Sequence, residues 1–152
     1  MIPYYNNVAR LEALSAAIKS WIGTPWVPYS QLKGVGVSCH QLCAALYCET
    51  GLIGESLTMN LRGYDSRQAG AAVNWINARH EFEEAHGGIF PGDLLVMVGD
   101  RLHMAVGAPN GQVWGECVEI AQCMGARGVQ LHSAADPSIG AKLVGVWRPI
   151  QR

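Results

Sequence analysis

One cysteine in this sequence stands where a helix should begin, and this position favours a reactive thiol. Gly34 and Gly36 make the preceding segment a flexible loop, and Ser38 and Gln41 have the spacing of a helix capping box. Cys39 would then be the first helical residue, where unpaired backbone N–H groups and the helix dipole stabilise a thiolate. We therefore expect Cys39 to have a lowered pKa and to act as a nucleophile. On position alone, it fits equally well as a small apolar residue.

A histidine later in the chain has the properties of a general base for this thiol. His103 lies in an apolar run, residues 101–108, of the kind that forms a β-strand. A strand can aim the ring rigidly at a helix that packs on the sheet. Imidazole titrates in the range needed to take the thiol proton and return it to a leaving amine. The alternative is a strand histidine that faces solvent.

The elements that must position these two residues are helices first and strands afterwards. Apolar periodicity and turn residues predict helices over 8–22, 39–49 and 66–80, a loop over 26–37, a connector over 54–64, and strands over 82–85, 93–98, 101–108, 112–119, 128–132 and 143–147. Asn6 or Asn7 would cap the first helix, Gly51 would end the second, and Asp65 or Ser66 would cap the third. This order predicts an α+β fold in which N-terminal helices pack on a C-terminal antiparallel sheet.

Length and composition predict a single domain over residues 1–152. An apolar content of 49% suits a soluble globular protein, and a net charge of −1 gives no broad attraction to nucleic acid or to an anionic membrane. The N-terminus lacks the pattern of a signal peptide, and no stretch approaches the ~20 apolar residues of a membrane span. Five cysteines without framework spacing indicate reduced thiols and cytosolic synthesis.

Four segments occur in an order that is similar to a known family. They are Trp21-Ile22-Gly23-Thr24-Pro25-Trp26, Gly34-Val35-Gly36-Val37-Ser38-Cys39, Pro91-Gly92-Asp93-Leu94-Leu95 and His103-Met104-Ala105-Val106-Gly107. In this order they resemble the NlpC family of papain-like cell-wall cysteine peptidases, most closely its phage-encoded branch. The resemblance runs from about Ala9 to about Pro149. It implies a papain-like fold and a catalytic pair formed by Cys39 and His103.

The resemblance also implies a polar residue that orients the imidazole from the start of the next strand. Counting about a dozen residues on from His103 reaches Gly115 and its neighbour Glu116. We expect the Glu116 carboxylate to accept a hydrogen bond from the ring, as in a catalytic triad. A solvent-facing Glu116 is the alternative, and the substitutes for it are Gln112, Gln130 and His132.

We expect four further residues to contact substrate, three of them at positions matched to the family. Trp26 replaces a tyrosine that lines the active site, and Tyr29 would supply the missing hydroxyl, although both aromatics also suit ordinary packing. Ser38 stands where relatives have Asp, which it matches as a helix cap but not in charge. His40 stands where they have Ser, and it suits either substrate contact or an exposed surface.

No cofactor is expected. Five residues would have to converge to make a zinc site, namely Cys39, Cys43, His103, Cys117 and Cys123. Their spacing lacks the closely paired ligands of structural zinc motifs. We expect no metal site.

Two functions remain open. The resemblance implies a cysteine hydrolase that cleaves an amide bond in the stem peptide of bacterial peptidoglycan. The alternative is a catalytically degenerate structural or binding component of a phage tail or a related particle. Because no signal peptide is visible, we expect cytosolic synthesis followed by delivery to the cell envelope in a virion tail, with phage tail proteins as partners.

Overall fold

The helices form where apolar side chains recur at helical spacing. A computed structural model describes residues 1–54, 61 and 63–151 and contains α1 (Val8–Trp21), α2 (Cys39–Glu49), α3 (Gln68–Asn77) and α4 (Pro137–Lys142). The Asn7 side chain caps α1 by accepting a hydrogen bond from the Arg10 N–H at 2.9 Å. The chain leaves α2 through Gly51, whose φ of +81° favours glycine. The predicted cap of α1 and stop of α2 are confirmed.

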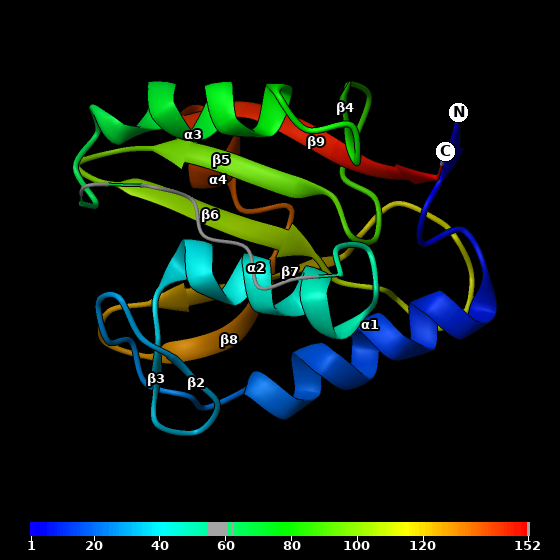
Figure 1. The fold of residues 1–152 in the computed structure, drawn as a ribbon, viewed down its shortest axis with the longest axis horizontal. Coiled ribbons are helices and arrows are strands. Elements are labelled where there is room, and N and C mark those ends of the chain that lie inside the picture. Colours follow the sequence, from blue (N-terminus) through cyan, green and yellow to red (C-terminus); the bar gives the residue numbers. More distant parts are fainter. Residues whose placement is uncertain (55–60, 62, 152) are drawn as a thin grey trace.

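The apolar runs of the second half form one antiparallel sheet (Figure 1). Its strands are β1 (Ile2–Pro3), β4 (Phe82–Ala85), β5 (Leu94–Val98), β6 (Leu102–Gly107), β7 (Glu119–Met124), β8 (Gly128–Ser133) and β9 (Leu143–Gln151). The order is β1-β9-β5-β6-β7-β8, and β4 also pairs with β9. A separate hairpin joins β2 (Gln31–Leu32) to β3 (Gly36–Val37). The predicted α+β class, with helices packed on an antiparallel sheet, is confirmed.

Alternation along the strands assigns the two faces of the sheet to different helices. Leu94, Val96 and Met104 pack in the main core with side chains from α1, α2 and α3. Leu95 and Ala105, on the other face, pack in a smaller core with α4. In Figure 1, α2 lies in front of the sheet and α4 behind it. The first residue of α2 therefore reaches the sheet from the side opposite α4.

A buried ion pair fixes the turn that leads into β5. Asp93 is fully buried, and its carboxylate accepts hydrogen bonds from the Arg148 guanidinium at 2.9 and 2.8 Å and from the Phe90 N–H at 2.8 Å. Gly92 has a φ of +86°, and a Cβ at this position would lie 2.1 Å from the Tyr5 ring. The turn before β5 thus requires both the glycine and the aspartate.

Four elements differ from the sequence-based expectation. The strand predicted over 112–119 is wrong, because Trp114 stacks on Phe90 and the Cys117 N–H donates to the Ile89 carbonyl at 2.7 Å, outside the sheet; β7 begins at Glu119. The loop predicted over 26–37 contains the β2–β3 hairpin. The strand β1 and the helix α4 were not predicted.

The predicted cap of α3 is also wrong. Asp65 accepts a hydrogen bond from the Arg67 N–H at 2.9 Å and forms a turn before the helix, which starts at Gln68. Part of the connector predicted over 54–64 lies outside the described residues.

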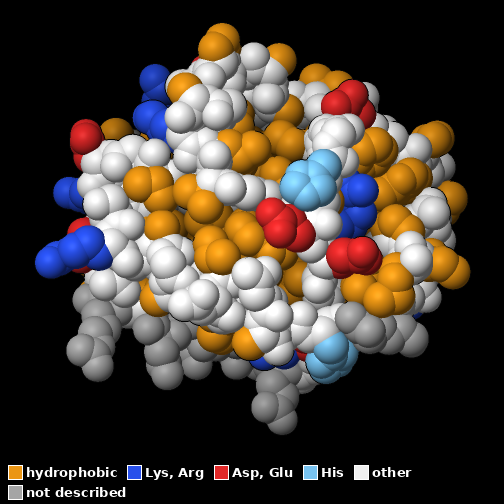
Figure 2. All heavy atoms as spheres, turned by 90° about the horizontal axis from the view of Figure 1, so that it is seen from above, with side chains coloured by type: hydrophobic (Ala, Val, Ile, Leu, Met, Phe, Trp, Pro, Cys, Tyr) orange, Lys and Arg blue, Asp and Glu red, His pale blue; other side chains and the backbone are white. Residues whose placement is uncertain are grey.

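The outer face formed by α3, β4 and β9 is chemically mixed. Figure 2 views the molecule from this side and shows hydrophobic side chains interspersed with acidic, basic and histidine side chains. No block of one charge covers this face, which agrees with the net charge of −1. Among the described residues, no helix has the length and apolar character to cross a membrane.

Candidate active site

The first turn of α2 approaches the sheet where β6 and β7 separate. The β6–β7 ladder pairs Ala105 to Gly107 with Ile120 to Gln122. At this end of the ladder, the Cys39 thiol receives a hydrogen bond from the Met104 backbone. As the sequence predicted, Cys39 is the first residue of α2, and it is 3% exposed. The thiol therefore lies beside the residue that follows His103.

Burial dominates the electrostatics of the thiol. Desolvation raises the pKa of Cys39, although hydrogen bonds from the backbone of Met104, His40 and Cys39 itself act to lower it. The expectation of a lowered pKa is wrong, because the helix N-terminus does not compensate for the loss of solvent. Cys39 is thus a neutral thiol at pH 7 in the free protein.

The predicted capping box is not formed as expected. Ser38 is the N-cap residue, but its hydroxyl donates to the Gln41 side-chain oxygen at 2.6 Å and caps no backbone N–H. The Gln41 carbonyl also accepts a hydrogen bond from the Gln31 amide at 2.8 Å. The two side chains bind each other, so neither of them occupies the N–H groups of the first turn around Cys39.

His103 is held from the neighbouring strand by an amide. Its Nε2 lies 2.8 Å from Oε1 of Gln122. Gln122 is paired with Ala105 across the ladder, two residues from His103, so the two side chains are diagonal neighbours on one face. Because an amide oxygen only accepts, Nε2 carries the proton and Nδ1 is left as the base.

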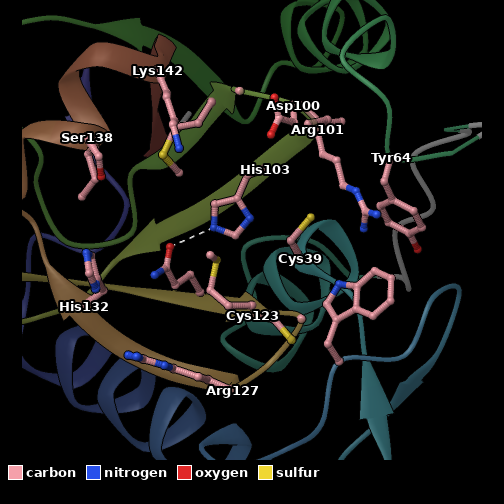
Figure 3. A pocket seen from close by; sticks show the side chains of 18 of the residues that line it. Cys39, Tyr64, Asp100, Arg101, His103, Cys123, Arg127, His132, Ser138 and Lys142 are labelled. Carbon is pink, nitrogen blue, oxygen red and sulfur yellow. Dashed lines mark hydrogen bonds between the residues drawn. The ribbon is translucent and has the colours of Figure 1, made fainter.

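The ring and the thiol point at each other within a cavity (Figure 3). The sulfur of Cys39 lies on the side of the His103 ring opposite Gln122, facing the nitrogen that Gln122 does not bind. The cavity has a volume of about 620 Å³. Desolvation lowers the pKa of His103, the bond to Gln122 raises it, and the charge of Lys142 lowers it. His103 is therefore a neutral base at pH 7.

Glu116 does not take the position expected of the orienting residue. Its carboxylate packs against Gly88, and it does not line the cavity. The count from the family failed because β7 starts at Glu119, so that Gln122 is the residue that reaches the ring. The sequence did contain a signal for Gln122, since it is the single amide within the apolar run from Ile120 to Cys123. Of the three substitutes, Gln130 and His132 line the cavity.

The four residues expected to contact substrate lie in different places. Trp26 lines the cavity, and its ring contacts the Tyr64 ring at 5.6 Å between centroids. Tyr29 is exposed and Ser38 is fully buried, and neither lines the cavity. His40 is also not a lining residue, and it is buried rather than on the surface. Its ring lies 5.3 Å from that of Tyr64.

No metal cluster is found within the described part of the chain, where no group of three or more His, Cys, Asp or Glu residues is arranged to hold an ion. Cys39 and Cys123 both line the cavity, but the Cys123 thiol donates to the Val37 carbonyl at 3.3 Å. The residues that meet at the site are suited to thiol chemistry with a histidine base.

Comparison with known structures shows the same fold in NlpC/P60 proteins. A family protein from Bacillus cereus matches at a TM-score of 0.52, covering 90% of this chain and 39% of its own, with 14% identity. A Staphylococcus aureus protein described as similar to a lipoprotein of the NLP/P60 family matches at a TM-score of 0.64, covering 99% of this chain and 44% of its own, with 14% identity. The NlpC/p60 domain of the peptidoglycan hydrolase SagA matches at a TM-score of 0.50, covering 93% of this chain and 98% of its own, with 14% identity.

These likenesses establish the papain-like fold predicted from the sequence. The chain spans about two fifths of the length of the first two structures. No protein-family model matches the sequence. No curated protein sequence matches it.

Proposed function

We propose that this protein is a cysteine hydrolase that cleaves an amide bond in the peptide of bacterial peptidoglycan. The observation that carries the proposal is the arrangement of Cys39, His103 and Gln122 in one cavity, with the thiol and the amide on opposite sides of the ring. The fold shared with the NlpC/p60 domain of the peptidoglycan hydrolase SagA supports the choice of substrate.

The geometry favours proton transfer during attack. Nδ1 of His103 takes the proton of the Cys39 thiol as the sulfur attacks the carbonyl carbon, and the N–H groups at the start of α2 stabilise the developing oxyanion. The carbon–nitrogen bond breaks, and His103 returns the proton to the leaving amine. Water, deprotonated by the same nitrogen, then hydrolyses the thioester and regenerates the thiol.

Gln122 acts through the ring. Its amide oxygen accepts a hydrogen bond from the Nε2–H group. This bond holds His103 in the tautomer whose Nδ1 is a base, and it stabilises the imidazolium that forms in each step. An amide does this more weakly than a carboxylate, because it carries no negative charge.

Replacement of the nucleophile tests the proposal. Purified peptidoglycan and defined stem peptides are incubated with the wild type, Cys39→Ser and Cys48→Ser, and the products are identified by mass spectrometry. We expect new amine and carboxylate ends with the wild type and with Cys48→Ser, which alters the last turn of α2. We expect none with Cys39→Ser, because serine is a far weaker nucleophile with this base. Undiminished hydrolysis by Cys39→Ser would refute the proposal.

Burial of the thiol favours a second candidate, a binding component that keeps the fold without the chemistry. The raised pKa of Cys39 is the observation behind it. Peptide binding without any turnover by the wild type would identify this function.

We also propose that the protein reaches the cell envelope as part of a phage tail or a related particle. Its support is the resemblance of the sequence motifs to phage-encoded members of the family. Mass spectrometry of purified particles from a host that encodes this protein would detect it. Its absence from all of them would exclude this route.

A further inference from the structure

Two cationic side chains line the half of the cavity that lies beyond His103, seen from Cys39 (Figure 3). Lys142 is the last residue of α4, and Arg127 lies in the turn between β7 and β8. Neither forms an ion pair with another residue in the described ranges. Both charges are therefore available to an anion that enters the cavity.

The acidic side chains that line the cavity do not form ion pairs with these two cations. Asp136 accepts a hydrogen bond from Nε2 of His132 at 2.6 Å and another from the Ser138 N–H at 2.9 Å. Asp100 lies beside Arg101 in the turn between β5 and β6. Among the described residues, neither Asp136 nor Asp100 forms an ion pair with Arg127 or Lys142, so an anion that reaches these cations displaces no carboxylate of the protein.

The direction of the reaction assigns this half of the cavity to one part of the substrate. His103 must protonate the leaving amine from Nδ1, so the leaving nitrogen lies between the thiol and the ring, and the rest of the leaving group extends past the ring on the His103 side of the cavity. On the other side, Tyr64 and Trp26 provide an aromatic surface for the acyl part. This step rests on the proposed function.

We propose that Arg127 and Lys142 bind a carboxylate on the leaving-group half of the substrate, so that the enzyme selects peptides whose amine product is anionic. Charge-assisted hydrogen bonds from a guanidinium and an ammonium are among the stronger polar contacts. Water competes less with these bonds inside a partly enclosed cavity than on an open surface. The carboxylate belongs either to the C-terminus of the leaving peptide or to an acidic side chain on it.

Binding of amine products tests the site without requiring catalysis. Isothermal titration calorimetry compares alanyl-alanine with its carboxamide, and alanyl-glutamic acid amide with alanyl-glutamine amide. In one of the two pairs, we expect the carboxylate ligand to bind about tenfold more tightly to the wild type. The pair that shows the preference identifies the source of the carboxylate.

Variants locate the preference. Arg127→Gln and Lys142→Gln should each reduce it severalfold, and the double variant should abolish it. Arg101→Gln removes a cation that lines the same cavity on the Tyr64 side and should retain the preference. Equal binding within both pairs by the wild type, or an unchanged preference in the double variant, would overturn the inference. Peptide hydrolysis without a carboxylate preference would overturn the inference alone, whereas a preference without hydrolysis would overturn the proposed function alone.

Discussion

Nε2 of His103 and Oε1 of Gln122 are 2.8 Å apart, joined from adjacent strands at the last pair of the β6–β7 ladder. Beyond this pair the ladder ends, and the first turn of α2 brings Cys39 to the other side of the ring. The amide therefore fixes the ring at the position where a helix can reach it. The contacts of the His103 ring therefore depend both on the pairing of β6 with β7 and on the placement of α2.

Gln122→Ala should lower turnover by about tenfold, because the ring loses the bond that fixes its tautomer and orientation. Gln122→Glu should retain more activity and shift the pH profile upward, since a carboxylate raises the pKa of His103. Steady-state rates between pH 5 and 9 measure both effects. Glu116→Gln is the matched control and should match the wild type, as Glu116 lies against Gly88. A wild-type profile for Gln122→Ala would show that the ring needs no such support.

The positions of Cys39 and His103 could be predicted because each depends on local patterns. A loop with a helix start defines the first, and an apolar run with a turn on each side defines the second. Gln122 could not be placed in this way, because strand residues 119–124 follow a segment whose packing against Ile89 and Phe90 is not visible in the sequence. The direction of the Cys39 pKa shift could not be predicted for a similar reason. The helix N-terminus that would lower the pKa is visible in the local sequence, whereas the burial that raises it depends on the whole fold.

Cys39 should react slowly with iodoacetamide at pH 6 and faster as the pH rises above 8, because burial raises the thiol pKa and lowers that of His103. A preformed thiolate–imidazolium pair would instead react rapidly at pH 6. Mass spectrometry of the labelled peptide separates Cys39 from the other four cysteines. His103→Ala should leave the alkylation profile almost unchanged. A plateau of reactivity that begins below pH 6 in the wild type would contradict the neutral pair.

Arg148→Met should destabilise the protein by about 3–5 kcal/mol, because it leaves a buried carboxylate without its partner. Burial already raises the pKa of Asp93 against the opposing effect of Arg148, so the unpaired carboxyl would hold a proton more readily. The loss should therefore shrink as the pH falls from neutral toward the ordinary pKa range of an aspartate. Urea unfolding at several pH values measures it, and Asp93→Asn in the same chain should recover part of it. An equal loss at pH 4 and pH 7 would rule out the unpaired charge as the cause.

His40 should make the stability of this protein sensitive to mild acid. The ring is 5% exposed, its Nδ1 has no hydrogen-bond partner among the described residues, and burial lowers its pKa to about 4. In the unfolded chain the same ring takes a proton near pH 6.5. As the pH falls through 6.5, His40 is therefore protonated in the unfolded chain but stays neutral in the folded protein. The unfolding free energy declines until about pH 4, where the folded protein also binds the proton.

The size of this effect follows from the difference between the two pKa values, which corresponds to a loss of up to about 3 kcal/mol. His40→Phe keeps a ring against Tyr64 and cannot titrate, so its unfolding free energy should fall less between pH 7 and pH 4.5. His86→Gln, at an exposed position, should follow the wild type. Urea unfolding of the three proteins across this range supplies the comparison, with carboxylate titration common to all of them. Parallel curves for the wild type and His40→Phe would show that the folded protein accommodates a charged ring at this position.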